Sequence, residues 1–220
     1  MSYWSRTIHC AWRDEGPESY VATMGRALQT VVLATHGDTV WTRTGQHTGA
    51  TDLPLTDRGE RNAGRLGRRL NGMTFARILT MPLERAVSTC ELTGFGDMAE
   101  MEADLAEWDY GKYEGLSPLQ VYRSRADWEL FSDGCPGGET PEQVARRADR
   151  VLGRVRAASG DVLLVSGGDF LRVLAARWLG LPPIAGKYFT LGTASLSGLG
   201  YDRDITRPVV RFWDDRSNTR

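Results

Sequence analysis

Apolar residues along the chain alternate between two patterns. Short apolar runs rich in β-branched residues indicate buried strands at 30–34, 76–80 and 161–166. Apolar residues at helical spacing indicate helices at 56–70, 82–92, 141–158 and 170–179. Two later segments, 194–201 and 209–213, also have strand character. Strands that alternate with helices over short connections predict an α/β fold, a three-layer α/β/α sandwich with a mostly parallel sheet.

The rest of the chain divides into an extension and one irregular stretch. Residues 1–27 have no clear apolar period, so we interpret them as an N-terminal extension of a single domain at 28–220. Met24, just before the first strand, is an alternative start of the protein. Residues 102–138 are the least regular part and are predicted to form an insertion over one edge of the sheet.

Charge, hydropathy and cysteine spacing exclude several classes of protein. The net charge is −1, from 27 basic and 28 acidic residues, which gives no long-range field for nucleic acid or an anionic membrane. No apolar run approaches the ~20 residues of a membrane span, and the N-terminus lacks a secretory signal. Cys10, Cys90 and Cys135 lie far apart, without metal-site spacing. We therefore expect a cytoplasmic protein with no metal and no cofactor.

The residues that directly follow the three buried runs are the first candidates for chemistry, because open α/β sheets bind ligands beyond the carboxyl ends of their strands. A single histidine, arginine or glycine pair at such a position is a weak signal and is more often structural. Here three such segments occur in order: Thr35-His36-Gly37, Met81 to Arg85, and Gly167-Gly168-Asp169.

Taken together with their flanking sequence, these segments resemble the histidine phosphatase superfamily, in its phosphoglycerate-mutase-like branch. The resemblance runs from about residue 31 to 214, and its supporting segments are 44–49, 54–59, 107–111, 136–139 and 170–174. It implies a two-step phosphoryl transfer in which His36 attacks phosphorus and Glu107 protonates the leaving oxygen. Arginines and a second histidine would hold the phosphoryl oxygens, since catalysis of this kind is mainly positioning and charge stabilisation.

The chain departs from that family pattern at three positions. Thr35 stands where the motif has arginine, Gly167 where it has the second histidine, and Met81 where it commonly has serine. The counterparts His36, Arg85 and Glu107 are retained. Removing one transition-state donor costs ~3–4 kcal/mol, and each ~1.4 kcal/mol is tenfold in rate. The resemblance thus implies a degenerate active site with a weakened hold on a phosphate dianion.

Several other residues near these positions are candidate substrate-binding groups. Arg43 could replace a lost cation or be an ordinary surface arginine. Gln46 and Thr48 either contact the ligand or shape a turn between two glycines. Asp169 either adds a repelling anion to the pocket or caps the helix that follows.

Three hypotheses for function follow from these observations. The favoured one is a repurposed bacterial enzyme of specialised metabolism, an isomerase, lyase, cyclase or hydrolase acting on a small metabolite. In it His36 and Glu107 act as base and acid, and Arg85 binds an anionic group. The second is a weak phosphomonoesterase that works through phospho-His36, with Arg43 or Arg172 supplying charge. The third is a non-catalytic binding or regulatory protein. We expect the protein to bind a small-molecule substrate and to bind neither nucleic acid nor a membrane. The sequence leaves open whether the protein forms a homodimer.

Overall fold

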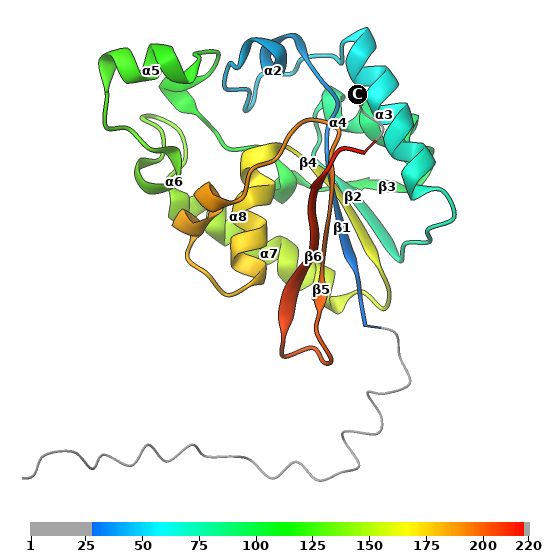
Figure 1. Ribbon diagram of the computed structural model, residues 1–220. Coiled ribbons are helices and arrows are strands. Elements are labelled where there is room, and N and C mark those ends of the chain that lie inside the picture. The colour runs from blue at the N-terminus through cyan, green and yellow to red at the C-terminus, as the bar shows by residue number, and fades with distance from the viewer. Residues whose placement is uncertain (1–27, 218–220) are drawn as a thin grey trace, which may run out of the picture.

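A six-stranded sheet forms the centre of the part of the chain that the computed structural model describes, residues 28–217 (Figure 1). The predicted N-terminal extension, 1–27, lies outside the described residues. The strand order across the sheet is β3-β2-β4-β1-β5-β6. The strands are β1 (Val31–Thr35), β2 (Arg77–Thr80), β3 (Ala99–Met101), β4 (Val162–Ser166), β5 (Leu196–Tyr201) and β6 (Pro208–Asp215).

One strand of the sheet, β5, runs against the other five. β1, β2, β3 and β4 pair in parallel, whereas β5 pairs antiparallel with both β1 and β6. The fully buried runs of β1 and β4 occupy the middle of the sheet, as expected of parallel strands that are covered on both faces. The predicted mostly parallel sheet is therefore confirmed.

Helices cover both faces of this sheet. The pair α3 (Asp57–Leu70) and α4 (Glu84–Leu92) packs together, and so does the pair α7 (Pro141–Ala157) and α8 (Gly168–Trp178) (Figure 1). Thr140 caps α7 through the predicted capping box with Gln143, which satisfies amides that the first helical turn leaves unpaired. The predicted three-layer α/β/α sandwich is confirmed.

Short elements fill the stretch that the sequence pattern left irregular. Residues 102–138 contain two 3₁₀ turns and two small helices, α5 (Pro118–Ser124) and α6 (Leu130–Asp133). A further helix, α2 (Val40–Thr44), follows β1, and the remaining 3₁₀ turns are Gly96–Met98 and Pro183–Tyr188. Figure 1 shows α2, α5 and α6 grouped beyond one end of the sheet.

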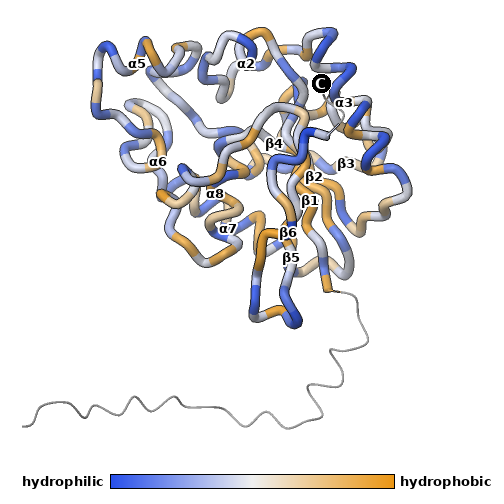
Figure 2. The backbone as a smooth tube through the Cα atoms, in the orientation of Figure 1, coloured by the Kyte–Doolittle hydropathy of each residue, from blue (hydrophilic) through white to orange (hydrophobic). Residues whose placement is uncertain are grey.

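The hydrophobic core lies between the sheet and its two helical layers. Figure 2 shows the central strands as apolar and the outer side of α3 as hydrophilic. The outward face of α3 is rich in arginine, whereas its buried side chains include Ala63, Leu66 and Leu70. Among the described residues, no helix is both long and apolar enough to cross a membrane.

Strand direction decides which residues meet at the carboxyl edge of β1. The residues after β1, β2 and β4 meet there because these strands are parallel. The residues before β5 join them because β5 is antiparallel, and those after β6 join because β6 again runs with β1. Five segments of the chain, those after β1, β2, β4 and β6 and the one before β5, therefore converge on one edge of the sheet.

Candidate active site

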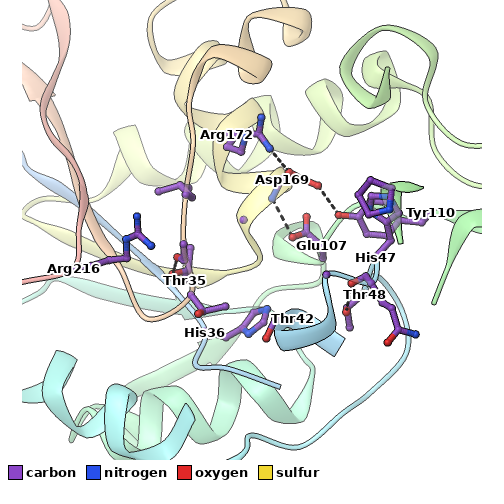
Figure 3. Close-up of a pocket in the computed structure, with 17 residues that line it drawn as sticks. Thr35, His36, Thr42, His47, Thr48, Glu107, Tyr110, Asp169, Arg172 and Arg216 are labelled. Atoms are coloured by element: carbon purple, nitrogen blue, oxygen red, sulfur yellow. Dashed lines mark hydrogen bonds and ion pairs between the residues drawn. The ribbon is translucent and has the colours of Figure 1, made fainter. Parts of the chain in front are cut away.

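A cavity of about 520 Å³ opens at this edge of the sheet. Its wall is drawn from the ends of β1 and β6, the loop after α2, the 107–110 segment, the start of α8 and the loop before β5 (Figure 3). The lining residues on which the site is built are Thr35, His36, Gln46, Thr48, Glu107, Tyr110, Asp169, Arg172, Thr193 and Arg216. Among residues 28–217, no group of three or more His, Cys, Asp and Glu side chains could hold a metal ion.

His36 is held as a neutral imidazole with its lone pair on Nε2. The Nε of Arg85 donates to Nε2 of His36 at 3.3 Å, so that nitrogen is the acceptor. The other ring nitrogen, Nδ1, must then carry the proton and donate to the Gly37 carbonyl at 2.8 Å. Burial, followed by the positive charge of Arg85, lowers the pKa of His36 to about 3. The imidazole is therefore neutral, with Nε2 unprotonated, across the physiological range.

Arg85 lies behind the cavity wall. Its side chain is fully buried, and its guanidinium donates to the carbonyls of Thr48, Gly49 and Thr51 as well as to His36. These contacts fix the guanidinium and, through it, the ring of His36. Because Arg85 is buried and does not line the cavity, an anionic ligand in the cavity would not touch it without a movement of the wall.

The carboxylate of Glu107 occupies the start of α8. It accepts the backbone amides of Asp169 at 3.1 Å, Phe170 at 2.7 Å and Trp108 at 2.8 Å. The missing side chain of Gly167 makes this possible, because a Cβ at that position would clash with the carboxyl group of Glu107. Burial, followed by the negative charge of Asp169, raises the pKa of Glu107 to about 7, although the three amides act in the opposite direction. Glu107 is thus a proton donor poised near neutrality.

Asp169 faces the cavity and does not cap its own helix. Its carboxylate accepts the hydroxyl of Tyr110 at 2.7 Å and pairs with the guanidinium of Arg172 at 2.6 Å (Figure 3). Arg172 is held further by the Gly186 carbonyl. The charge of Arg172 is therefore largely offset by Asp169 on the same wall.

The opposite wall contains Thr35. Its hydroxyl donates to the Gly192 carbonyl at 2.6 Å and accepts the Ser195 amide at 2.9 Å. The amide of Gly192 in turn donates to Asp214, which pairs with Arg216. Thr35 therefore joins β1 to the loop before β5 and adds no charge to the cavity.

The remaining predicted site residues differ in where they lie. Gln46 and Thr48 line the cavity, and Gln46 also braces the loop by donating to the Gly115 carbonyl at 2.7 Å. Arg43 is exposed on α2, outside the cavity wall. Met81 is fully buried in the hydrophobic core, with its amide bonded to the Val165 carbonyl of β4, and does not line the cavity either. Gly167 acts only through the space that it leaves for Glu107.

Sequence reasoning did not anticipate Thr42, Thr193 and Arg216, which also line the cavity. Thr193 precedes β5 and Arg216 follows β6, so the directions of these two strands bring them to the edge where His36 lies. An antiparallel assignment for β5 was the one signal that could have identified Thr193 and Arg216.

The fold and the site together define a class of protein. Residues 31–215 match the model of the histidine phosphatase superfamily (branch 1), so the chain belongs to that superfamily.

Individual relatives agree with this assignment. The chain is 37% identical over 191 residues to an acid phosphatase of Mycobacterium tuberculosis, which covers 85% of this chain and 94% of the relative. It is 30% identical over 183 residues to a Cronobacter sakazakii protein named "Probable phosphoglycerate mutase GpmB", covering 79% and 85%. The solved structure of the M. tuberculosis open reading frame Rv3214 aligns with a TM-score of 0.80 at 35% identity, covering 84% of this chain and 97% of that one.

Proposed function

We propose that this protein is a diverged histidine-phosphatase-fold enzyme that acts on a small metabolite and is not an efficient phosphatase. His36 serves as base and Glu107 as acid in one cavity. The observation that carries this proposal is the position of the Glu107 carboxylate on the first amides of α8.

The start of a helix is the natural place for an anion, because its free amides and its dipole attract negative charge. Here a carboxylate of the protein itself already takes the amides of Asp169 and Phe170. A phosphate dianion would have to displace it and would then face the Asp169 carboxylate. Neither Thr35 nor Gly167 supplies the cation or imidazole that would compensate.

Proton transfer fits the same geometry. With a pKa near 7, Glu107 can give a proton at neutral pH and take it back, as a general acid requires. His36 keeps its Nε2 lone pair available at every physiological pH. An anionic group placed beside it would offset the charge of Arg85 and raise the pKa of His36 toward the range of an effective base. Direct binding of such a group by Arg85 additionally needs a movement of the wall that buries it.

A weak phosphomonoesterase is the second candidate, and two observations favour it. The neutral His36 tautomer, in which Nε2 carries the lone pair and Nδ1 the proton, is also what a phosphoryl acceptor needs, although Arg85 must release Nε2 before it can attack. One relative, at 37% identity, is named an acid phosphatase. In this alternative Glu107 protonates the leaving oxygen of a phosphate ester, and a phospho-His36 intermediate forms.

Hydrolysis of p-nitrophenyl phosphate between pH 5 and 7.5 separates the two candidates. We expect the wild-type protein to be on the order of 10⁴-fold slower than the M. tuberculosis acid phosphatase assayed beside it, since each missing donor is worth ~10²–10³ in rate. His36→Ala is the matched variant. Rapid turnover that this variant abolishes would establish the phosphatase and refute the proposal.

The positive test is a screen of phosphate-free metabolites with the intact protein. We expect a substrate whose conversion is lost in both His36→Ala and Glu107→Gln. Conversion that survives both substitutions would place the chemistry elsewhere and refute the assignment of base and acid.

A further inference from the structure

The ring of His36 is held in one tautomer by groups outside the cavity. Its backbone is fixed first, because the His36 amide donates to the Ser166 carbonyl at 3.2 Å and the Ala194 amide donates to the His36 carbonyl at 2.9 Å. In the ring, Nε2 accepts from Arg85 at 3.3 Å, and Nδ1 donates to the Gly37 carbonyl at 2.8 Å. Arg85 must release Nε2 before that nitrogen can react. The contact with Gly37 is then the one that keeps the proton on Nδ1.

Gly37 needs an external hold, because a residue without a Cβ turns easily about its backbone bonds. On one side the backbone of α3 packs against it, and a Cβ on Gly37 would lie 2.6 Å from the carbonyl oxygen of Gly59. On the other side its amide donates to the hydroxyl oxygen of Thr89 at 3.1 Å. Among residues 28–217, no other acceptor is bonded to this amide. The bond to Thr89 therefore orients Gly37 from the α4 side.

The hydroxyl of Thr89 is restricted to accepting from Gly37. Thr89 is fully buried on α4, four residues after Arg85, and donates its single hydroxyl proton to the Arg85 carbonyl at 2.6 Å. The lone pairs that remain on the oxygen serve the Gly37 amide. One helix thus acts on both ring nitrogens of His36, through Arg85 at Nε2 and through Thr89 at Nδ1.

We propose that Thr89 is a positioning residue for His36. Its hydroxyl holds Gly37 so that the glycine carbonyl keeps the imidazole proton on Nδ1 and leaves the lone pair on Nε2. Without that hydroxyl the buried Gly37 amide loses its partner, and the Gly37 carbonyl loosens its hold on Nδ1. The assignment rests on the proposed function, to which it adds the residue that prepares His36, and it has the same form if Nε2 attacks phosphorus.

The Nδ1 proton of His36 reports this hold without any turnover. Nuclear magnetic resonance of the full chain, labelled with ¹⁵N at histidine, gives the tautomer of each ring at neutral pH. The same spectra give the rate at which the Nδ1 proton exchanges with water. The signals of His36 are those that are missing from His36→Ala.

Four variants separate the hydroxyl from the rest of the side chain. Thr89→Val removes the acceptor at nearly constant volume, and Thr89→Ala does so without placing a methyl group against the Gly37 amide. Thr89→Ser keeps the hydroxyl. Thr93→Val is the matched control, since Thr93 is a buried threonine at the C-terminal end of α4 whose hydroxyl also donates to a helix carbonyl, that of Cys90 at 2.7 Å. Circular dichroism verifies the fold of each variant.

We expect the wild-type ring of His36 to carry its proton on Nδ1. In Thr89→Val and Thr89→Ala that proton should exchange about tenfold faster or more, because the net contribution of one hydrogen bond corresponds to about that factor. Thr89→Ser and Thr93→Val should keep the wild-type tautomer and exchange rate, although Thr93→Val also loses a buried hydroxyl of the same helix.

Three results would overturn the inference. The first is a wild-type ring with its proton on Nε2. The second is exchange as slow as in the wild type in both folded Thr89→Val and folded Thr89→Ala. The third is exchange in Thr89→Ser or Thr93→Val as fast as in Thr89→Val. Failure of the proposed function has a different signature, since it appears as conversion of a metabolite that survives His36→Ala and leaves the ring signals of the wild type unchanged.

Discussion

Glu107→Gln tests the electrostatics of the site most directly. Glutamine keeps the volume of the side chain and removes its titrating proton. The oxygen that accepts the Trp108 and Phe170 amides can be retained, while the new amide group faces the donor N–H of Asp169. That lost acceptor costs roughly 1–3 kcal/mol at every pH. The informative quantity is the part of the change in unfolding free energy that varies with pH.

The sign and size of that part follow from the raised pKa. Between the ordinary value of 4.5 and the value of about 7 in the folded protein, the native state holds a proton that the unfolded state has lost. The contribution of Glu107 to the free energy of unfolding is therefore fully present below pH 4.5 and disappears as the pH rises through 7. At ~1.4 kcal/mol per pKa unit, the loss is roughly 3 kcal/mol for this fully buried group.

The unfolding free energy of the wild type, plotted alone against pH, would conceal the contribution of Glu107. The pKa of His36 is lowered from 6.5 to about 3, so its contribution to stability increases as the pH rises through the same window. Subtracting the curve of Glu107→Gln from that of the wild type cancels His36 and isolates Glu107.

Urea unfolding followed by tryptophan fluorescence at intervals from pH 4.5 to 8.5 gives the two curves. We expect the wild-type advantage over Glu107→Gln to shrink by roughly 3 kcal/mol between pH 4.5 and 7.5 and then to level off. Glu142→Gln, at an exposed glutamate of α7, controls for the loss of one charge. A difference that is constant with pH, or that grows with pH, would refute the raised pKa and with it the role of Glu107 as acid.

Three further predictions concern the same site. The kcat/KM of any substrate, which reports the free enzyme, should fall about tenfold per pH unit above about pH 7, as Glu107 loses its proton, with no limb from His36 between pH 5 and 9; the small residual rate of Glu107→Gln should not vary over this range. Arg147→Met should lower the free energy of unfolding by about 2 kcal/mol and speed amide exchange at 104–107, because Arg147 pairs with the partly buried carboxylate of Glu139 and binds three carbonyls of that segment; urea unfolding and hydrogen exchange measure both. The double change Thr35→Arg, Gly167→His should raise p-nitrophenyl phosphate hydrolysis by about 10² or more, because it restores two donors for phosphate and moves the Glu107 carboxylate off the amides of α8; a folded variant without gain would contradict the degenerate-clamp interpretation.

Local signals explain what could be predicted of the fold. The runs that became β1 and β4 are fully buried, and α7 begins at the predicted capping box, because apolar period and capping chemistry act within a few residues. The edge strand β3 (Ala99–Met101) was not predicted. It is short and mostly exposed, and it is a strand only because it pairs with β2. No pattern of its own distinguishes it from a loop.

The site was predictable to the same extent. His36 and Asp169 line one cavity because each follows a strand end that the pattern had located, whereas Glu107, which lines the same cavity, was expected only from the family resemblance. Met81 follows such an end too, yet its side chain is in the core, since position after a strand does not determine the direction of the side chain. Arg216 required the topology of the sheet, and no local spacing in the sequence indicates it.

The absence of a side chain at Gly167 and the raised pKa of Glu107 have one physical origin. Without a Cβ at position 167, the Glu107 carboxylate reaches the first amides of α8, where it is buried and lies close to Asp169. In this position the Glu107 carboxylate fills the anion site at the start of α8. The same surroundings raise its pKa, so that it becomes a proton donor near neutral pH. It follows that an imidazole at position 167 cannot simply be added to the present site, because it would evict Glu107 and return its carboxyl group toward solvent. The pKa of Glu107 should then fall toward its ordinary range. Nuclear magnetic resonance titration of the Glu107 side chain in Gly167→His measures that pKa, and a value still near 7 would show that the two features are independent.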